Sequence, residues 1–279
     1  MRKACVIGWP IEHSRSPLIH NYWLKKYGID AAYEKKAVEP ENVPQFIAKL
    51  ATSEFIGCNV TIPHKETVFQ AVAVADKIAS RLGAVNTVYL KDDVVCGTNT
   101  DGEGFIASLH HSYPAFDLRN KTAIIIGAGG AAKAIIGALL DEDVARIGII
   151  NRTRERTLGL QEQFGSHVFE INGTMTGNAL ENCNLLVNTT SQGMEGQPQL
   201  AVDIRRLKRN ALVADIVYVP LETTFMEKAK QLEHPVLGGL GMLLHQAVRG
   251  FELWFGLKPE VTAELYELVA ADVQKAHKQ

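Results

Sequence analysis

Hydrophobic and polar positions form short blocks along this chain, and the blocks predict strands and helices in alternation. Continuous β-branched runs are typical of buried strands, and apolar residues spaced three and four apart are typical of amphipathic helices. Before residue 101 we expect strands at Ala4–Ile7, Ala32–Val38 and Phe55–Thr61, then a hairpin of Val85–Leu90 with Val94–Gly97. Helices are expected to begin at Ser16 as N-cap, near Val43 and at Lys65, the last running unbroken to Leu82.

The alternation continues after residue 101 with a different connectivity. Strands are expected at Ile124–Ile126, Arg146–Ile150, Val168–Ile171, Leu185–Asn188, Leu212–Ile216 and Pro235–Leu237. Two further helices, Gly241–Phe255 and Val261–Lys275, belong to no strand–helix repeat. The pattern predicts an α/β protein with a mostly parallel N-terminal αβ domain, a Rossmann-type domain, and C-terminal helices that return to the first domain. The expected boundaries are 1–101 completed by 239–279, and 102–238.

A glycine-rich loop lies between the strand at Ile124–Ile126 and an apolar helix. Its sequence fits the G-x-G-x-x-A form of a dinucleotide fingerprint, in which Gly127 permits the tight turn, Gly129 lets the backbone approach a pyrophosphate and Ala132 lets helix and strand pack closely. Free N–H groups at the helix start favour anionic phosphates. Taken alone, the loop is also compatible with a structural turn that binds nothing.

The end of the next strand indicates which dinucleotide the loop serves. An acid at this position accepts from a ribose hydroxyl, whereas an arginine accommodates a 2′-phosphate. The position holds Asn151, followed by Arg152, with Arg154 and Arg156 close by. We therefore expect NADP rather than NAD, with Arg152 on the phosphate and Asn151 and Thr153 in support. The alternative is that these arginines only begin a solvated helix.

Composition narrows the class of protein without identifying it. The chain has 279 residues, of which 46% are hydrophobic and 22% charged, and its formal net charge is -2. These values are ordinary for a globular protein and give no reason to expect a nucleic acid or a membrane surface as partner. The four cysteines form no C-x-x-C pair, so buried free thiols in a cytoplasmic protein are expected, and no metal site.

Three polar clusters stand at predicted strand ends in the first domain. Ser14 and Ser16 offer two hydroxyls at a helix start, although helix capping explains Ser16 equally well. Asn59 and Thr61 share one face of a strand, and Lys65 stands at the next helix start, against the helix dipole. A solvated lysine is the competing explanation. The third cluster, Gly83–Thr87 with Gly97–Gly102, is equally compatible with ordinary turns.

At these residues the sequence resembles the shikimate dehydrogenase family. The matching stretches follow the family order over nearly the whole chain: Ile11–Pro17, Asn59–Lys65, Gly83–Thr87, Asn99–Gly102, Gly127–Ala132, Asn151–Thr153, Asn188–Met194, Val217–Pro220 and Gly239–Ala247. The resemblance implies reversible NADPH-dependent reduction of 3-dehydroshikimate to shikimate, in aromatic amino-acid biosynthesis. It also implies a small-molecule substrate bound by the first domain. A monomer and a homodimer are both compatible with the sequence, which has no readable signature of a dimer surface.

The resemblance also assigns roles by position. Lys65 and Asp101 form the catalytic pair. Ser14, Ser16 and Tyr218 hold the substrate carboxylate, and Asn59, Thr61, Asn86, Asp101 and Gln246 hold the ring hydroxyls. The cofactor is expected to contact Gly127, Ala128, Gly129, Gly130, Ala131, Asn151, Arg152, Thr153, Thr189, Ser191, Met194, Gly239 and Met242.

Two alternatives remain open at this point. A quinate/shikimate dehydrogenase of broader specificity would use NAD, which Arg152 disfavours. A non-catalytic metabolite sensor of the same fold has no reason to keep both Lys65 and Asp101. The sequence does not decide which of these two residues transfers the proton.

Overall fold

The computed structural model describes residues 2–172 and 176–277, and the chain divides into two compact units. Unit 1 comprises Met1–Asp101 and Leu244–Val269, and unit 2 comprises Gly102–Leu243 and Ala270–Gln279. The domain boundaries expected from the sequence stay a prediction, and the units are described one at a time.

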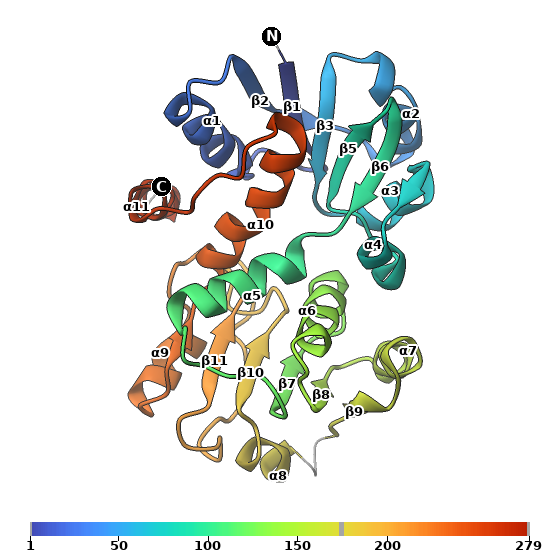
Figure 1. Ribbon diagram of the computed structural model, residues 1–279. Coiled ribbons are helices and arrows are strands. Elements are labelled where there is room, and N and C mark those ends of the chain that lie inside the picture. The colour runs from blue at the N-terminus through green and yellow to red at the C-terminus, as the bar shows by residue number, and fades with distance from the viewer. Residues whose placement is uncertain (1, 173–175, 278–279) are drawn as a thin grey trace. The chain divides into compact units, whose positions relative to one another are not determined.

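Unit 1 is built on a mixed sheet. Its strands are β1 (Arg2–Gly8), β2 (Ala31–Ala37), β3 (Phe55–Val60), β4 (Val74–Ala75), β5 (Thr87–Lys91) and β6 (Val94–Thr98). They lie in the order β2-β1-β3-β5-β6-β4 (Figure 1). β1 pairs in parallel with β2 and β3, whereas β5 runs antiparallel to both β3 and β6. The polar carboxyl ends of β1 and β3 therefore meet at one edge of the sheet.

The helices of unit 1 correct two expectations. They are α1 (Ser16–Lys26), α2 (Val43–Ala48), α3 (Lys65–Ala71) and α4 (Lys77–Leu82), with 3₁₀ turns at Pro40–Asn42 and Leu50–Thr52. The single helix expected over residues 65–82 is wrong. Val72 is extended, Val74–Ala75 pairs with β6, and the Asp76 carboxylate caps α4 by accepting from the Ala79 amide at 2.8 Å. The β-branched residues favour the strand that interrupts the helix.

Ser16 is also not the N-cap that we expected. The cap position is Arg15, which makes no side-chain capping hydrogen bond, and Ser16 is the first helical residue with Pro17 behind it. The Ser14 hydroxyl instead accepts from the Ser16 amide at 3.3 Å. The Ser16 hydroxyl is therefore not used to cap α1.

Most of α10 (Gly239–Phe255) and the first half of α11 (Ala263–His277), the C-terminal helices, belong to unit 1. The part of the chain that joins unit 1 runs from Leu244 to Val269. Trp254 donates from Nε1 to the Val88 carbonyl at 2.9 Å, and Trp23 donates to the Glu260 carbonyl at 2.9 Å. A Cβ atom at Gly57 would lie 2.1 Å from Trp254 Nε1, so the close approach of α10 to the sheet requires glycine there.

Unit 2 is a doubly wound parallel sheet, which confirms the predicted Rossmann-type fold. Its strands are β7 (Thr122–Ile126), β8 (Arg146–Ile150), β9 (Val168–Glu170), β10 (Leu185–Asn188), β11 (Leu212–Asp215) and β12 (Val236–Leu237). The helices are α5 (Asp101–Ser112), α6 (Gly130–Asp141), α7 (Arg154–Phe164), α8 (Thr176–Glu181) and α9 (Thr224–Gln231), with a 3₁₀ turn at Gly165–His167. The strand order is β12-β11-β10-β7-β8-β9 (Figure 1). Strands β8 and β9 are added on one side of β7, and β10 to β12 on the other, so the topological switch point lies between β7 and β10, where such folds bind ligands.

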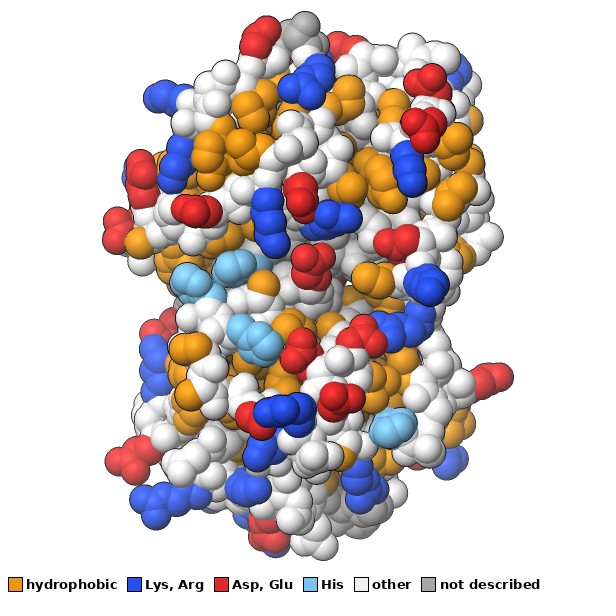
Figure 2. All heavy atoms as spheres, viewed as in Figure 1, with side chains coloured by type: hydrophobic (Ala, Val, Ile, Leu, Met, Phe, Trp, Pro, Cys, Tyr) orange, Lys and Arg blue, Asp and Glu red, His pale blue; other side chains and the backbone are white. Residues whose placement is uncertain are grey.

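The surface carries mixed charge. Acidic and basic side chains are interspersed over the face drawn in Figure 2, in keeping with a net charge of -2. Within the described residues, none of the helices has the length and apolar character needed to cross a bilayer.

Candidate active site

Lys65 and Asp101 lie together in unit 1, each at the start of a helix. Lys65 begins α3 and Asp101 begins α5, and their side chains form an ion pair between Nζ and Oδ2. The lysine side chain is 25% exposed and the aspartate 11%, so the ammonium can be reached from solvent while the carboxylate is largely covered. The carboxylate thus offsets the unfavourable placement of a lysine at a helix N-terminus.

Asn86 fixes the other side of the Asp101 carboxylate. Its Nδ2 donates to Asp101 Oδ1 at 2.8 Å, and its Oδ1 accepts from the backbone N–H of Thr100 at 2.9 Å. The Asp101 amide in turn donates to Asn99 Oδ1 at 3.1 Å. Both carboxylate oxygens of Asp101 are therefore engaged, and the Lys65 ammonium is held in one place, where it can stabilise negative charge that develops on a neighbouring oxygen.

The predicted hydroxyl-binding residues are only partly joined to this pair. Asn59, 5% exposed at the end of β3, donates from Nδ2 to Thr87 Oγ1 at 3.2 Å. Gln246 is joined through its backbone, since its carbonyl accepts from Thr100 Oγ1 at 2.9 Å. Thr61 follows β3, and its methyl group faces Gly8. The roles of these residues stay a prediction.

Sequence reasoning did not find Tyr33. This tyrosine lies on β2, is 3% exposed, and donates from its hydroxyl to Asn59 Oδ1 at 2.6 Å. The Ser16 side chain also hydrogen-bonds to it, which counteracts part of the rise in the pKa of Tyr33 caused by burial. The available signal was a single large aromatic residue in a strand whose other side chains are small or charged, because a buried phenol needs a polar partner.

In unit 2 the glycine-rich loop has the shape that a pyrophosphate requires. Gly127 has a φ of +111°, and a Cβ atom there would lie 2.7 Å from Thr189 Oγ1. Gly129 caps α6, and neither Gly129 nor Gly130 has an atom within 4 Å of the position that a Cβ would take. The backbone N–H groups at the start of α6 are thus open to an anion.

The β8–α7 turn fits a 2′-phosphate. Asn151 donates from Nδ2 to the Thr153 carbonyl at 2.7 Å, which stabilises the turn. Arg154 is engaged by Glu170 at 3.2 Å. Arg152 is exposed and forms no hydrogen bond or ion pair with any residue that the structure describes. Of these two arginines, Arg152 is the one whose guanidinium is available to a ligand.

The other predicted cofactor residues are distributed over the loops of unit 2. Ala128 and Ala131 belong to the glycine-rich segment, whereas Ser191 and Met194 are exposed in the loop after β10. Gly239 and Met242 lie in the first turn of α10, and Tyr218, which was predicted to bind the substrate carboxylate, follows β11. A Cβ atom at Gly239 would lie 2.1 Å from the Ile216 carbonyl oxygen, which explains the glycine by packing.

Asp215, which the sequence did not single out, organises these loops. Its Oδ1 accepts from Asn188 Nδ2 at 2.9 Å and from the Val217 amide at 3.0 Å, and its Oδ2 accepts from Thr223 Oγ1 at 2.7 Å. Burial raises the pKa of Asp215 to about 6 in spite of these donors. The carboxylate joins the ends of β10 and β11 to the start of α9.

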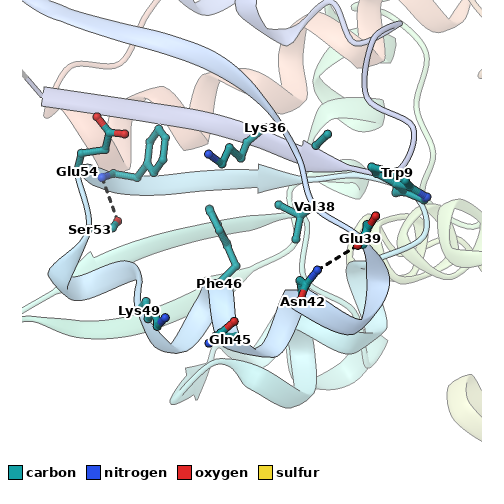
Figure 3. Close-up of a pocket in the computed structure, with 12 residues that line it drawn as sticks. Trp9, Lys36, Val38, Glu39, Asn42, Gln45, Phe46, Lys49, Ser53 and Glu54 are labelled. Carbon is teal, nitrogen blue, oxygen red and sulfur yellow. Dashed lines mark hydrogen bonds between the residues drawn. The ribbon is translucent and has the colours of Figure 1, made fainter.

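A separate groove in unit 1 contains none of the predicted site residues. It has a volume of about 730 Å³ and lies beside β2 and α2. Figure 3 shows Trp9, Phe46 and Lys36 lining it, with Asn42 donating to Glu39 at 3.2 Å. The groove is therefore not the site of the chemistry described above.

Comparisons with known proteins place the sequence motifs in a family. Residues 6–88 match the family model described as "Shikimate dehydrogenase substrate binding domain", residues 109–219 match "Shikimate / quinate 5-dehydrogenase", and residues 239–263 match "Shikimate 5'-dehydrogenase C-terminal domain".

Curated relatives and solved structures agree with the family models. The chain is 50% identical to a protein named "Shikimate dehydrogenase (NADP(+))" from Rhodopseudomonas palustris strain BisB5, over 97% of this chain and 95% of the relative. It is similar to the shikimate 5-dehydrogenase of Thermus thermophilus solved with NADP(H) and shikimate, with a TM-score of 0.86, 31% identity and coverage of 99% and 100%. It is also similar to the quinate dehydrogenase of Corynebacterium glutamicum solved with NAD, with a TM-score of 0.87, 26% identity and coverage of 97% and 99%.

Proposed function

The chain belongs to the shikimate dehydrogenase family, and from that premise we propose that it catalyses the reversible, NADPH-dependent reduction of 3-dehydroshikimate to shikimate. The observation that carries the proposal is the Lys65–Asp101 ion pair, held by Asn86 at the carboxyl ends of the unit 1 strands. A sensor that only bound a metabolite would not need an ammonium held in this way.

The reaction requires two things of the protein. NADPH, when bound, supplies the hydride that forms the new C–H bond at the carbonyl carbon. The electrons of the broken C–O π bond move to the oxygen, which must then receive a proton. Lys65 stabilises this oxygen and donates the proton, because its ammonium can be reached from solvent whereas both oxygens of Asp101 are engaged by Lys65 and Asn86. Asp101 orients the ammonium.

The remaining residues bind the two small molecules. Ser14, Ser16 and Tyr218 take the substrate carboxylate, and Asn59, Thr61, Asn86 and Gln246 take the ring hydroxyls with Asp101. The open N–H groups of the Gly127 loop take the pyrophosphate, and Arg152 takes the 2′-phosphate. NADP is the cofactor in the names of the curated relatives, in agreement with Arg152 in place of an acid. The cysteines in the described residues are free and buried, which supports a cytoplasmic location.

The test is steady-state oxidation of shikimate with NADP by the wild-type protein and by Lys65→Ala. We expect turnover in the wild type and a decrease in kcat on the order of 10³-fold or more in the variant, because the charge on the oxygen then loses its partner. Lys77→Ala is the matched control, since Lys77 is an exposed lysine that likewise begins a short helix of unit 1. Wild-type turnover in Lys65→Ala would refute the mechanism, and faster turnover with quinate and NAD would favour the broader dehydrogenase.

A further inference from the structure

Tyr33 is held rigidly by a cluster of aromatic rings in unit 1. The His20 imidazole stacks on the Tyr33 ring with centroids 4.1 Å apart and an interplanar angle of 13°, and the Trp254 ring lies 5.8 Å away. Burial lowers the pKa of His20 to about 3 and raises that of Tyr33 well above its ordinary value. Both rings are therefore neutral at physiological pH, and the phenol keeps the proton that it donates to Asn59.

A continuous chain of buried hydrogen bonds leads from this phenol to the reactive pair. Tyr33 donates to Asn59 Oδ1 at 2.6 Å, and Asn59 Nδ2 donates to Thr87 Oγ1 at 3.2 Å. Thr87 donates to Asn86 Oδ1 at 2.9 Å, and Asn86 Nδ2 donates to Asp101 Oδ1 at 2.8 Å. Each donor in this chain points toward the carboxylate, an arrangement in which each bond strengthens the next.

The direction of the chain is fixed by a backbone group. The Thr100 N–H can only donate, and it donates to Asn86 at 2.9 Å, so that the atom it meets must be the amide oxygen. Thr87 must then give its proton to the same oxygen, which leaves Thr87 Oγ1 as an acceptor for Asn59. The Asn59 amide consequently presents its oxygen to Tyr33 and its Nδ2 to Thr87.

We infer that Tyr33 is a positioning residue, whose buried hydroxyl holds the Asn59 amide in the orientation in which that amide binds a ring hydroxyl of the substrate. The inference rests on the proposed function, in which Asn59 binds the substrate ring. Without the phenol hydroxyl, the buried Asn59 oxygen loses its short donor, and the amide is held only from the side of its Nδ2, by Thr87. The substrate then meets an amide that is held less firmly in place.

Steady-state kinetics of Tyr33→Phe test this role. We expect KM for shikimate to rise about tenfold, the effect of one lost buried hydrogen bond, while kcat and KM for NADP stay within about twofold. The decisive measurement is a double-mutant cycle, in which Tyr33→Phe no longer changes kcat/KM once Asn59 is replaced by alanine. Thr87→Val, which breaks the next link, should raise KM in the same way, and Thr87→Ser should restore it.

The controls separate this inference from the proposed function. Tyr22→Phe removes another tyrosine hydroxyl of unit 1, bonded to Glu264 at 2.8 Å, and should leave KM unchanged. An unchanged KM in Tyr33→Phe, or an equal effect of this substitution with and without Asn59, would overturn the positioning role while leaving wild-type activity intact. Absence of NADP reduction by the wild type would instead refute the proposed function.

Discussion

Acid should destabilise unit 1 through a single histidine, His20 of α1. The His20 ring is fully buried between Tyr33, Trp23, Phe251 and Trp254, with centroid distances from 4.1 to 6.0 Å. This surrounding lowers the pKa of His20 from 6.5 to about 3, chiefly by desolvation and against the opposing effect of the Asn59 side chain. The folded protein therefore does not bind a proton that the unfolded chain accepts.

The magnitude follows from the two pKa values. Because the folded-state pKa is the lower one, the stabilising contribution is fully present above pH 6.5 and is lost as the pH falls toward 3. Proton uptake by the unfolded chain should reduce the free energy of unfolding by about 2 kcal/mol at pH 5 and by about 3 kcal/mol at pH 4, relative to neutral pH. This loss is large against the total stability of an ordinary domain.

The assay compares slopes rather than absolute stabilities. Free energies of unfolding from urea titrations, followed by circular dichroism at several pH values from 7 to 4, should fall less steeply in His20→Phe than in the wild type. Trp23→Phe is the matched control, because it disturbs the same aromatic cluster without removing a titratable group, and it should shift all values equally. Parallel curves for the wild type and His20→Phe would refute the reasoning.

Three further predictions test other parts of the molecule. Arg152→Ala should weaken NADP binding by about tenfold to a hundredfold and leave NAD binding nearly unchanged in fluorescence titrations, because a charge-assisted bond is lost; equal losses for both cofactors would contradict this role. Asp215→Asn should make the loss of stability between pH 7 and pH 4 larger by about 2 kcal/mol than in the wild type, since the raised pKa makes protonation of Asp215 favour the folded state and the variant lacks this contribution; an unchanged slope in urea titrations would exclude it. Gly57→Ala should reduce the free energy of unfolding by about 2–4 kcal/mol, because the new Cβ overlaps Trp254 and displaces its hydrogen bond. A melting temperature equal to that of the wild type would show that Trp254 moves aside without loss of stability.

The features predictable from the sequence are those encoded by local pattern. The strand, glycine loop and helix around Gly127 follow one another in the chain, and β7 and α6 are found as expected. The break at Val72–Ala75 was missed because helical spacing continues through it, while pairing with β6, a partner distant in sequence, favours the strand. Ser16 was placed at the N-cap on composition, although Ser14 already accepts from the Ser16 amide.

The part of the site that the sequence could not show depends on long-range contacts. Tyr33 reaches Asn59 across 26 residues, and Asn59 reaches Thr87 across 28. No spacing rule connects such positions, since their proximity results from the order of strands in the sheet. Lys65, by contrast, was noticed because a lysine at a helix start departs from what local structure alone would favour, whereas Asp101 was assigned through the family resemblance.

The docking of α10 determines the order in which the parts of the chain can be completed. Unit 1 consists of the first 101 residues and a second segment, Leu244–Val269, that supplies Trp254 to the sheet. During synthesis from the N-terminus, the β1–β6 sheet remains incomplete, with the face around Gly57 uncovered, until the intervening 142 residues of unit 2 have been made. Most of unit 2 is continuous and can fold in the meantime. We therefore expect the part of the protein that is translated first to be completed only after most of unit 2 has been made, and a chaperone that shields nascent apolar surface to matter most for this segment.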